Sequence, residues 1–388
     1  MRAVTRRQVL LGSAAATLSA LVGACAPRAV ATPTPPAPTS AVTAETHPTE
    51  LPPTPAPATT ATATTATATA ATATAATAAA PTAPPPTAPP TSAAKEPSPT
   101  PLGAADMAVV RGADPAATGA VAAATERALA AIGGIERFVK PGYDVIIKPN
   151  ICNANHGPEY ASTTNPEVVA ALVRMCLGAG AKRVRAMDYP FSGTAARAYV
   201  TSGIEEAVRA AGGEMEVMAP MAYVEADIPE GQDIKRWPFY QPILEADLVI
   251  NVPIAKHHSL ARLTLAGKNL LGVIDNRSAI HRNMGARIAD LASHVRPQLT
   301  VMDAVRILMA NGPTGGNLND VKQIETVIAG ADWVAVDAYA TSLFGLRPED
   351  VSYIAAAAER GLGTTDLDSM EVAELDLGGM AYIPRQHP

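Results

Sequence analysis

Short apolar runs alternate with longer helix-type stretches along the C-terminal part of the chain. Residues 248–253 form the clearest predicted strand, and further strands are predicted at 144–147, 182–188 and 299–303. Because predicted strands and helices alternate, the pattern favours an α/β fold, with a mostly parallel sheet flanked by helices. This domain is predicted to span residues 105–388.

Local signals place helices between these strands. Asn165 or Thr164 can cap a helix that begins at Pro166, a residue suited to the first helical position. A second helix is predicted over residues 204–211, ahead of two glycines. Residues 333–337 open either a last strand or a helix, and the pattern allows both.

The segment before this domain has a different composition. Residues 26–104 are almost entirely Ala, Thr and Pro, and residues 58–80 contain only Ala and Thr. Such a segment buries too little apolar surface to offset its chain entropy, so we expect it to be disordered or to adopt polyproline II. It is either a stalk that holds the domain away from a membrane or a tolerated linker.

The first 25 residues carry an export pattern. Arg6 and Arg7 precede a weakly apolar run of about 15 residues, which is the layout of a twin-arginine signal. A spanning helix needs about 20 strongly apolar residues, so a permanent membrane helix is the weaker interpretation. The pattern predicts export by the twin-arginine machinery, which carries folded proteins.

Residues 21–25 read Leu-Val-Gly-Ala-Cys and look like a lipobox, in which a peptidase cuts just before a cysteine that receives acyl chains. Simple cleavage near Ala24, which would release a free protein, is the alternative. Two acyl chains on Cys25 would meet the requirement for stable anchoring. We therefore expect an extracytoplasmic protein, tethered through Cys25 to the outer face of the cytoplasmic membrane.

Charge and cysteine content argue against two classes of function. The chain has a formal net charge of −6, only 4% aromatic residues and no basic stripe, so nucleic acid is not an expected partner. Besides Cys25 it has Cys152 and Cys176 and no C-x-x-C, so an iron–sulfur cluster bound by this chain alone is not expected. Both cysteines are predicted to pack in the interior. For Cys152, a ligand, a nucleophile or a disulfide with Cys176 are the alternatives.

Charged residues recur where predicted strands end. Lys148, Asp188, Lys256 and Asp303 all fall at or just beyond the carboxyl end of a predicted strand. In open α/β sheets ligands bind in the crevice outside these ends, so the four side chains are expected to converge on one site. The alternative is that each is simply a solvated loop residue.

A lysine also interrupts an apolar stretch further along the chain. Lys268 and Asn269 lie within the glycine-punctuated run of residues 264–272. Because an unpaired buried charge is costly, Lys268 needs a partner or an anionic ligand, unless its side chain reaches solvent.

Two histidines extend the candidate chemistry. Neutral imidazole is a common metal ligand and a general base near pH 7, which makes His258 and His281 candidates for both roles. His257 and His258 are adjacent, so at most one is expected to face the site. With the two carboxylates, the candidate metal ligands are His258, His281, Asp188 and Asp303.

Polar residues around the lysines complete a candidate ligand site. Asn150 follows the first strand, and residues 311–316 form a donor-rich, glycine-rich loop that suits an anion but lacks the lysine of a P-loop. The candidate ligand-binding residues are Lys148, Asn150, Lys256, Lys268, Asn269 and Thr314.

Residues 148–150, 247–258 and 267–272 together resemble the domain of unknown function 362 family. Later segments around Asp303, residues 312–315 and Asp337 are also similar to that family, so the resemblance covers residues 109–377. It implies no general activity. Some members carry a ferredoxin-like module and are labelled iron–sulfur proteins, but this chain lacks those cysteines. The pattern after the main strand is also similar to the amino-terminal half of lactate racemase-like proteins, which is an analogy of fold.

Three function hypotheses follow from these residues. The protein is an exported enzyme or redox accessory protein, or a non-catalytic lipoprotein that binds an anion or delivers a metal or cofactor. The third alternative is an envelope interaction module in which the charged residues form a structural network. The sequence has no H-E-x-x-H, no G-x-G-x-x-G and no Ser-His-Asp spacing, so it assigns no reaction type and does not decide whether the protein is an enzyme.

Overall fold

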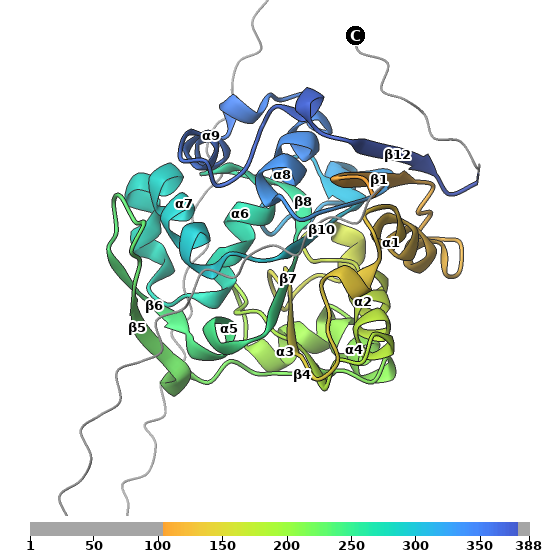
Figure 1. Cartoon of the computed structure of the whole chain (residues 1–388), viewed down its shortest axis with the longest axis horizontal. Coiled ribbons are helices and arrows are strands. Elements are labelled where there is room, and N and C mark those ends of the chain that lie inside the picture. Colours follow the sequence, from red (N-terminus) through yellow and green to blue (C-terminus); the bar gives the residue numbers. More distant parts are fainter. Residues whose placement is uncertain (1–103, 379–388) are drawn as a thin grey trace, which may run out of the picture. The chain divides into compact units, whose positions relative to one another are not determined.

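The structure is a computed structural model that describes residues 104–378 (Figure 1). The predictions for the export signal, Cys25 and the Ala/Thr/Pro segment as far as residue 103 lie outside the described residues. Within residues 104–378 there are a ten-stranded sheet, a two-stranded sheet and helices on both faces of the larger sheet. This arrangement confirms the predicted α/β fold.

The strands vary in length from two to ten residues. In chain order they are β1 (Met107–Arg111), β2 (Asp144–Pro149), β3 (Arg183–Ala186), β4 (Glu214–Met215), β5 (Tyr223–Asp227), β6 (Arg236–Tyr240), β7 (Leu248–Val252), β8 (Ile254–His258), β9 (Arg262–Thr264), β10 (Leu299–Leu308), β11 (Val321–Gly330) and β12 (Val372–Asp376).

The helices connect these strands or follow them. They are α1 (Ala120–Ala131), α2 (Pro166–Gly178), α3 (Ala195–Thr201), α4 (Ile204–Ala210), α5 (Gln241–Glu245), α6 (Ala266–Asn269), α7 (Met284–Val295), α8 (Trp333–Ser342) and α9 (Ser352–Glu359). Two 3₁₀ helices matter for the site, η4 (Leu270–Val273) and η5 (Arg277–Asn283).

The large sheet has the strand order β12-β1-β11-β10-β7-β2-β3-β4. From β10 to β4 neighbouring strands are parallel, whereas β11 is antiparallel to both β10 and β1. β8 leaves this order and pairs with β10 in parallel and with β9 in antiparallel fashion. The parallel part therefore delivers the carboxyl ends of β2, β3 and β7 to one edge of the sheet.

Both faces of the sheet are apolar because alternate side chains of each strand point to opposite sides. In β2, Ile146 packs with one core cluster, whereas Val145 and Ile147 pack with the other. The first cluster includes side chains of α6, α7, α8 and α9, and the second includes those of α1, α2 and α4. Figure 1 shows these two groups of helices on opposite sides of the strands.

Several local predictions hold. The α2 helix begins at Pro166, and the Asn165 carboxamide oxygen accepts a hydrogen bond from the Glu167 amide as its cap. The helix predicted over residues 204–211 is α4, and the ambiguous segment at 333–337 is the start of helix α8. Asp332 caps α8 by accepting hydrogen bonds from two amides of its first turn.

Two boundaries differ from the prediction. Lys256, His257 and His258 lie on β8, a second strand that begins just after Pro253, and are not loop residues. Asp303 lies in the middle of β10 rather than at its end, because that strand continues to Leu308 against β11. The strands β9, which pairs with β8, and β11, which pairs with β10, were not predicted from the local apolar pattern.

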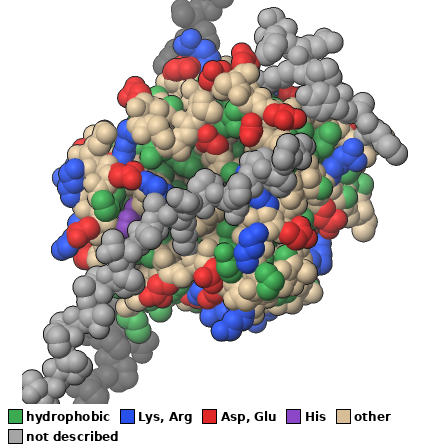
Figure 2. Space-filling view, viewed as in Figure 1, with side chains coloured by type: hydrophobic (Ala, Val, Ile, Leu, Met, Phe, Trp, Pro, Cys, Tyr) green, Lys and Arg blue, Asp and Glu red, His purple; other side chains and the backbone are tan. Residues whose placement is uncertain are grey.

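The surface of the described domain carries mixed charge. Figure 2 shows Lys and Arg side chains interspersed with Asp and Glu over the visible face. Ion pairs such as Arg183–Glu214 and Arg209–Glu205 account for part of this mixture and contribute little stability each. Among residues 104–378, no helix is both long enough and apolar enough to span a bilayer.

Candidate functional site

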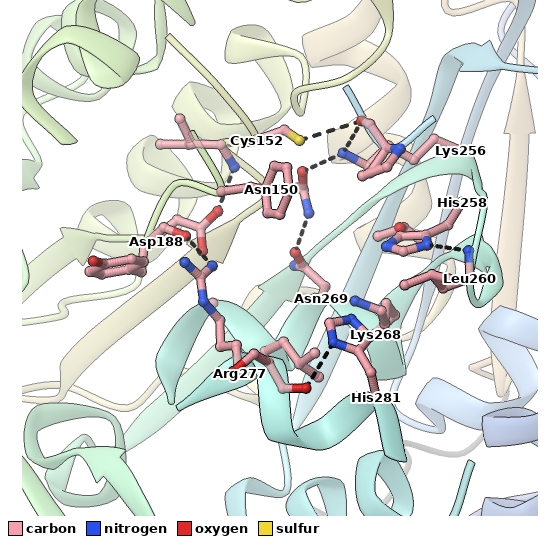
Figure 3. Close-up of a pocket in the computed structure, with 18 of the residues that line it drawn as sticks. Asn150, Cys152, Asp188, Lys256, His258, Leu260, Lys268, Asn269, Arg277 and His281 are labelled. Carbon is pink, nitrogen blue, oxygen red and sulfur yellow. Dashed lines mark hydrogen bonds between the residues drawn. The ribbon is translucent and has the colours of Figure 1, made fainter. Parts of the chain in front are cut away.

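A pocket of about 520 Å³ lies beyond the ends of β2 and β3, with β8 on one side and α6 and η5 on the other (Figure 3). This is the place where open α/β sheets bind ligands. Its polar lining consists of Lys148, Asn150, Cys152, Asp188, Lys256, His258, Ser259, Thr264, Lys268, Asn269, Asp275, Asn276, Arg277, Ser278 and His281.

Most of the candidate site residues meet in this pocket. Lys148, Asn150, Lys256, Lys268 and Asn269 line it, as do Asp188, His258 and His281. They come from separate parts of the sequence and are brought together by the order of the parallel strands.

Asp303 and Thr314 are not among the lining residues. Asp303 is buried in β10, where its carboxylate accepts hydrogen bonds from the amides of Asn165, at 2.7 Å, and Val305, at 3.0 Å. Burial raises the pKa of Asp303 to about 6. Its contacts tie the start of α2 to the sheet, and the pocket wall is formed by Pro313 rather than by Thr314.

Lys148 and Asp188 form a buried ion pair at the base of the pocket. The Lys148 Nζ lies 2.9 Å from Asp188 Oδ1 and donates hydrogen bonds to Asn269 Oδ1 and the Pro149 carbonyl. Asp188 Oδ2 accepts a hydrogen bond from the Ile151 amide at 2.6 Å. Burial lowers the pKa of Lys148, while the neighbouring Asp188 carboxylate opposes that shift. The pair therefore joins β2 to the loop after β3, and the Lys148 ammonium has no spare donor for a ligand.

Gly272 packs directly against this ion pair. A β-carbon on Gly272 would lie 1.8 Å from Asp188 Oδ1 and 2.6 Å from Lys148 Nζ, closer than non-bonded atoms can approach. Position 272 therefore requires glycine, because the backbone there lies against a buried ion pair and leaves no room for a side chain.

We expect Gly272→Ala to lower the free energy of unfolding by about 1–3 kcal/mol, because the added methyl group must displace the ion pair. Chemical denaturation followed by circular dichroism measures this. Gly178→Ala is the matched control, since a β-carbon there meets no atom within 4 Å. An equal effect of the two substitutions would contradict the packing role of Gly272.

Asn269 is the centre of an amide network. Its Oδ1 accepts hydrogen bonds from Lys148 and from Asn150 Nδ2, and its Nδ2 donates to the Lys148 carbonyl and to Asn251 Oδ1. Asn251 in turn donates to the Ala266 carbonyl. Asn251 was not predicted as a site residue, although an asparagine within the otherwise apolar strand β7 was a signal that could have identified it.

Lys256 is also fully engaged, but with neutral partners. Its ammonium donates to Asn150 Oδ1, the Ser162 carbonyl and the Pro313 carbonyl, at 2.6–3.1 Å. Burial lowers the pKa of Lys256. The thiol of Cys152 donates to the same Pro313 carbonyl at 3.4 Å. Cys152 is thus a wall residue of the pocket, whereas Cys176 packs in the apolar core, and both are free thiols.

Lys268 is different from the other two lysines. The residue is only 9% exposed, and its ammonium makes no hydrogen bond or ion pair with any residue in the range 104–378. Burial, together with the charges of Lys256 and Arg277, lowers the pKa of Lys268 to about 8. Helix α6 carries this lysine, and the Asp337 carboxylate holds that helix by accepting hydrogen bonds from the Ala266 and Gly267 amides.

The two histidines of the pocket have opposite tautomers. His258 Nδ1 accepts hydrogen bonds from the Leu260 and Ala261 amides, so the proton of the neutral ring is on Nε2. Burial, followed by the charge of Lys268, lowers the pKa of His258 to about 3, so the ring stays neutral. His281 Nδ1 lies 3.1 Å from the Ser278 carbonyl, an acceptor only, so its Nε2 carries a lone pair.

Arg277 is a pocket residue that the sequence analysis missed. Its guanidinium donates to the Tyr189 and Pro190 carbonyls and lies 4.4 Å from the centre of the Tyr189 ring. It lies four residues before His281 on η5, and this spacing was the only sequence signal that could have linked it to the site.

The lining carries a surplus of positive charge. Among the described residues, Lys148 is balanced by Asp188, and Lys256, Lys268 and Arg277 then face a single further carboxylate, Asp275. No group of three or more His, Cys, Asp or Glu in residues 104–378 is arranged to hold a metal ion. The electrostatics of the pocket therefore suit an anion.

Taken together, the fold and the site define an α/β domain with a lysine-rich pocket at the ends of its parallel strands. Residues 145–342, just over half of the chain, match the domain of unknown function (DUF362) family. The protein belongs to this family, as the resemblance of its lysine and asparagine segments predicted.

A curated relative extends the comparison. The chain is 27% identical over 256 residues to the thylakoid-associated protein sll1697 of Synechocystis sp., a match that covers 64% of this chain and 77% of the relative.

Two solved structures are also similar. The lactate racemase apoprotein from Thermoanaerobacterium thermosaccharolyticum has a TM-score of 0.34 and 12% identity, covering 57% of this chain and 53% of that one. A structural genomics protein from Thermotoga maritima has a TM-score of 0.32 and 12% identity, covering 57% and 58%. The chain thus spans little more than half the length of either structure, and neither likeness bears on the activity.

Proposed function

We propose that the protein binds a small anion in this pocket, with Lys268 as the principal charged contact. The observation that carries the proposal is Lys268, a largely buried residue that lines the pocket and whose ammonium has no partner in the described chain. Such a group is costly unless it is paired, so a ligand that brings a carboxylate, phosphate or sulfate group supplies the missing interaction.

The surroundings of Lys268 support an anion over a metal ion. A divalent cation in the pocket would face Lys256, Lys268 and Arg277. His258 could not serve as its ligand, because the Nδ1 atom of that ring accepts two amide hydrogen bonds and the Nε2 atom of the neutral ring carries the proton. The same His258 Nε2–H is a donor for an anion. Binding of this kind is compatible with an enzyme and with a non-catalytic carrier.

The expected test is the pH dependence of anion binding. With the pKa of Lys268 at about 8, its charged fraction falls between pH 7 and pH 9, so affinity should fall about tenfold over that range. Titration calorimetry with sulfate, whose charge is constant over this range, measures the change. The other titratable or charged groups that line the pocket are Lys148, Cys152, Asp188, Tyr189, Lys256, His258, Asp275, Arg277 and His281.

A Lys268→Arg variant is the control, because its guanidinium stays charged at pH 9 and should give a nearly flat profile. If the protein binds neither sulfate nor phosphate nor small carboxylates at pH 7, the proposed function is wrong. If the wild type and Lys268→Arg bind sulfate with the same pH dependence, Lys268 is not the charged contact.

We also propose that the protein is exported by the twin-arginine route and anchored through Cys25. This proposal rests on Arg6, Arg7 and the Leu-Val-Gly-Ala-Cys segment alone. Cys25→Ala should move the protein from the membrane fraction to the soluble extracytoplasmic fraction, and Arg6→Lys/Arg7→Lys should leave it in the cytoplasm. Cys152→Ala is the matched control and should keep the protein at the membrane.

A further inference from the structure

We propose that Lys268 forms a covalent imine with the carbonyl carbon of an anionic carbonyl compound, with 2-oxo acids as the substrate class. This inference rests on the proposed binding of anions in the same pocket. It adds that the amine of Lys268 is a nucleophile and that the bound anion carries a ketone or aldehyde.

The three buried lysines of the pocket differ in the freedom of their amines. The Lys148 ammonium is paired with Asp188 and donates to two oxygens, and the Lys256 ammonium donates to three. Deprotonating either one would sacrifice those contacts. Lys268 has no such contacts in the described chain, so losing its proton breaks no hydrogen bond.

The electrostatic environment favours the neutral amine of Lys268. Burial and the nearby charges of Lys256 and Arg277 both disfavour a third cation, and they bring the pKa of Lys268 to about 8. A desolvated lysine beside other cations is the usual arrangement of an amine that attacks carbonyl groups. A substantial neutral fraction is thus present near pH 8.

Two imidazoles lie on either side of this amine. Figure 3 shows Lys268 between the rings of His258 and His281, which come from β8 and η5. His281 has its Nε2 lone pair available as a proton acceptor, and His258 has an Nε2–H available as a donor. One ring can therefore take the proton that the amine loses, while the other stabilises the carbonyl oxygen.

The reaction balances without a further reactant. The Lys268 nitrogen bonds to the carbonyl carbon, the C=O electron pair moves to oxygen, and His281 accepts a proton from nitrogen and returns it to oxygen, which gives a hydroxyl group. The second nitrogen proton then joins that hydroxyl, the C–O bond breaks to release water, and the nitrogen electron pair forms the C=N bond. The net change is one carbonyl compound plus one amine giving one imine plus one water.

The rest of the pocket explains why the carbonyl compound should be an anion. Once the Lys268 nitrogen is used for the covalent bond, Lys256 and Arg277 still provide positive charge in the pocket lining. A carboxylate next to the carbonyl group is attracted by this field and places the carbonyl carbon in the same pocket. The imine also conjugates with that carboxylate.

Borohydride trapping tests the proposal. The purified protein is incubated with pyruvate at pH 8, reduced with sodium borohydride and analysed by intact and peptide mass spectrometry. We expect a stable adduct on the peptide containing Lys268, with the mass of pyruvic acid less one oxygen atom. Propionate, which has no ketone, should give no adduct, and Lys268→Arg should lose the adduct.

The outcomes separate this inference from the proposed function. Sulfate binding without a pyruvate adduct on Lys268, or with adducts only on exposed lysines, overturns the imine and leaves anion binding in place. Failure to bind any anion overturns both. His281→Gln should slow formation of the trapped adduct at least tenfold without weakening sulfate binding more than a few-fold, and an unchanged rate would remove His281 from the reaction.

Discussion

Replacing Lys148 by methionine should lower the free energy of unfolding by about 3–5 kcal/mol, because it leaves the Asp188 carboxylate buried without its counter-charge. Both side chains are almost completely buried, and the pair lies 2.9 Å apart. Methionine keeps the aliphatic length of lysine, so the loss reports the charge rather than packing volume. Denaturant unfolding monitored by circular dichroism measures it.

A second substitution distinguishes this explanation from a simple packing defect. Asp188→Asn, combined with Lys148→Met, removes both charges while leaving an oxygen to accept the Ile151 amide, so the double variant should recover most of the lost stability. Lys182→Met, at an exposed lysine, is the matched control and should change stability little. A loss below about 1 kcal/mol for Lys148→Met would indicate a solvent-screened pair and refute the buried one.

The sequence was sufficient for the fold class and for the elements with strong local signals. Residues 144–147 and 248–253 are strands β2 and β7 because both are apolar runs that pair with neighbours on either side. Helix α2 was predictable because Asn165 and Pro166 fix its first turn through local contacts. In each case the deciding interactions lie within a few residues, or require only that the segment be buried.

The strand boundaries that were predicted wrongly depend on pairing with strands far away in the sequence. Pro253 ends β7, but the chain continues at once as β8, because β9 and β10 supply new pairing partners for it. Likewise β10 runs past Asp303 because β11 pairs with its second half. A carboxylate in the middle of a strand resembles one at its end when only the local sequence is considered.

The residues of the site were largely predictable, but their roles were not. Lys148 and Lys256 were found because they follow predicted strands, and Lys268 because it interrupts an apolar stretch. Which of them is paired depends on contacts across the sequence, such as the bond between Lys148 and Asn269, 121 residues apart. Arg277 was missed because it lies in a polar stretch where an arginine is unremarkable.

Substituting Lys268 by methionine is expected to have two effects of opposite sign. The affinity for sulfate at pH 7 should fall on the order of a hundredfold, because the anion loses a charged hydrogen-bond donor in a buried site. The free energy of unfolding should rise by about 1–3 kcal/mol, because the folded protein no longer holds an unpaired charge on a largely buried side chain close to Lys256 and Arg277. Calorimetric titration and denaturant unfolding of the same preparation measure both quantities.

Lower sulfate affinity together with higher stability identifies a binding residue more firmly than lower affinity alone. A lysine with only a structural role, such as Lys148, should lose stability and binding together when it is replaced, because its contacts hold the pocket in shape. Lys268 can gain stability only if the folded protein keeps that ammonium unpaired in the absence of ligand. Lower stability in Lys268→Met, with Lys182→Met unchanged, would mean that the ammonium already has a partner, and the anion-binding role would then lose its physical basis.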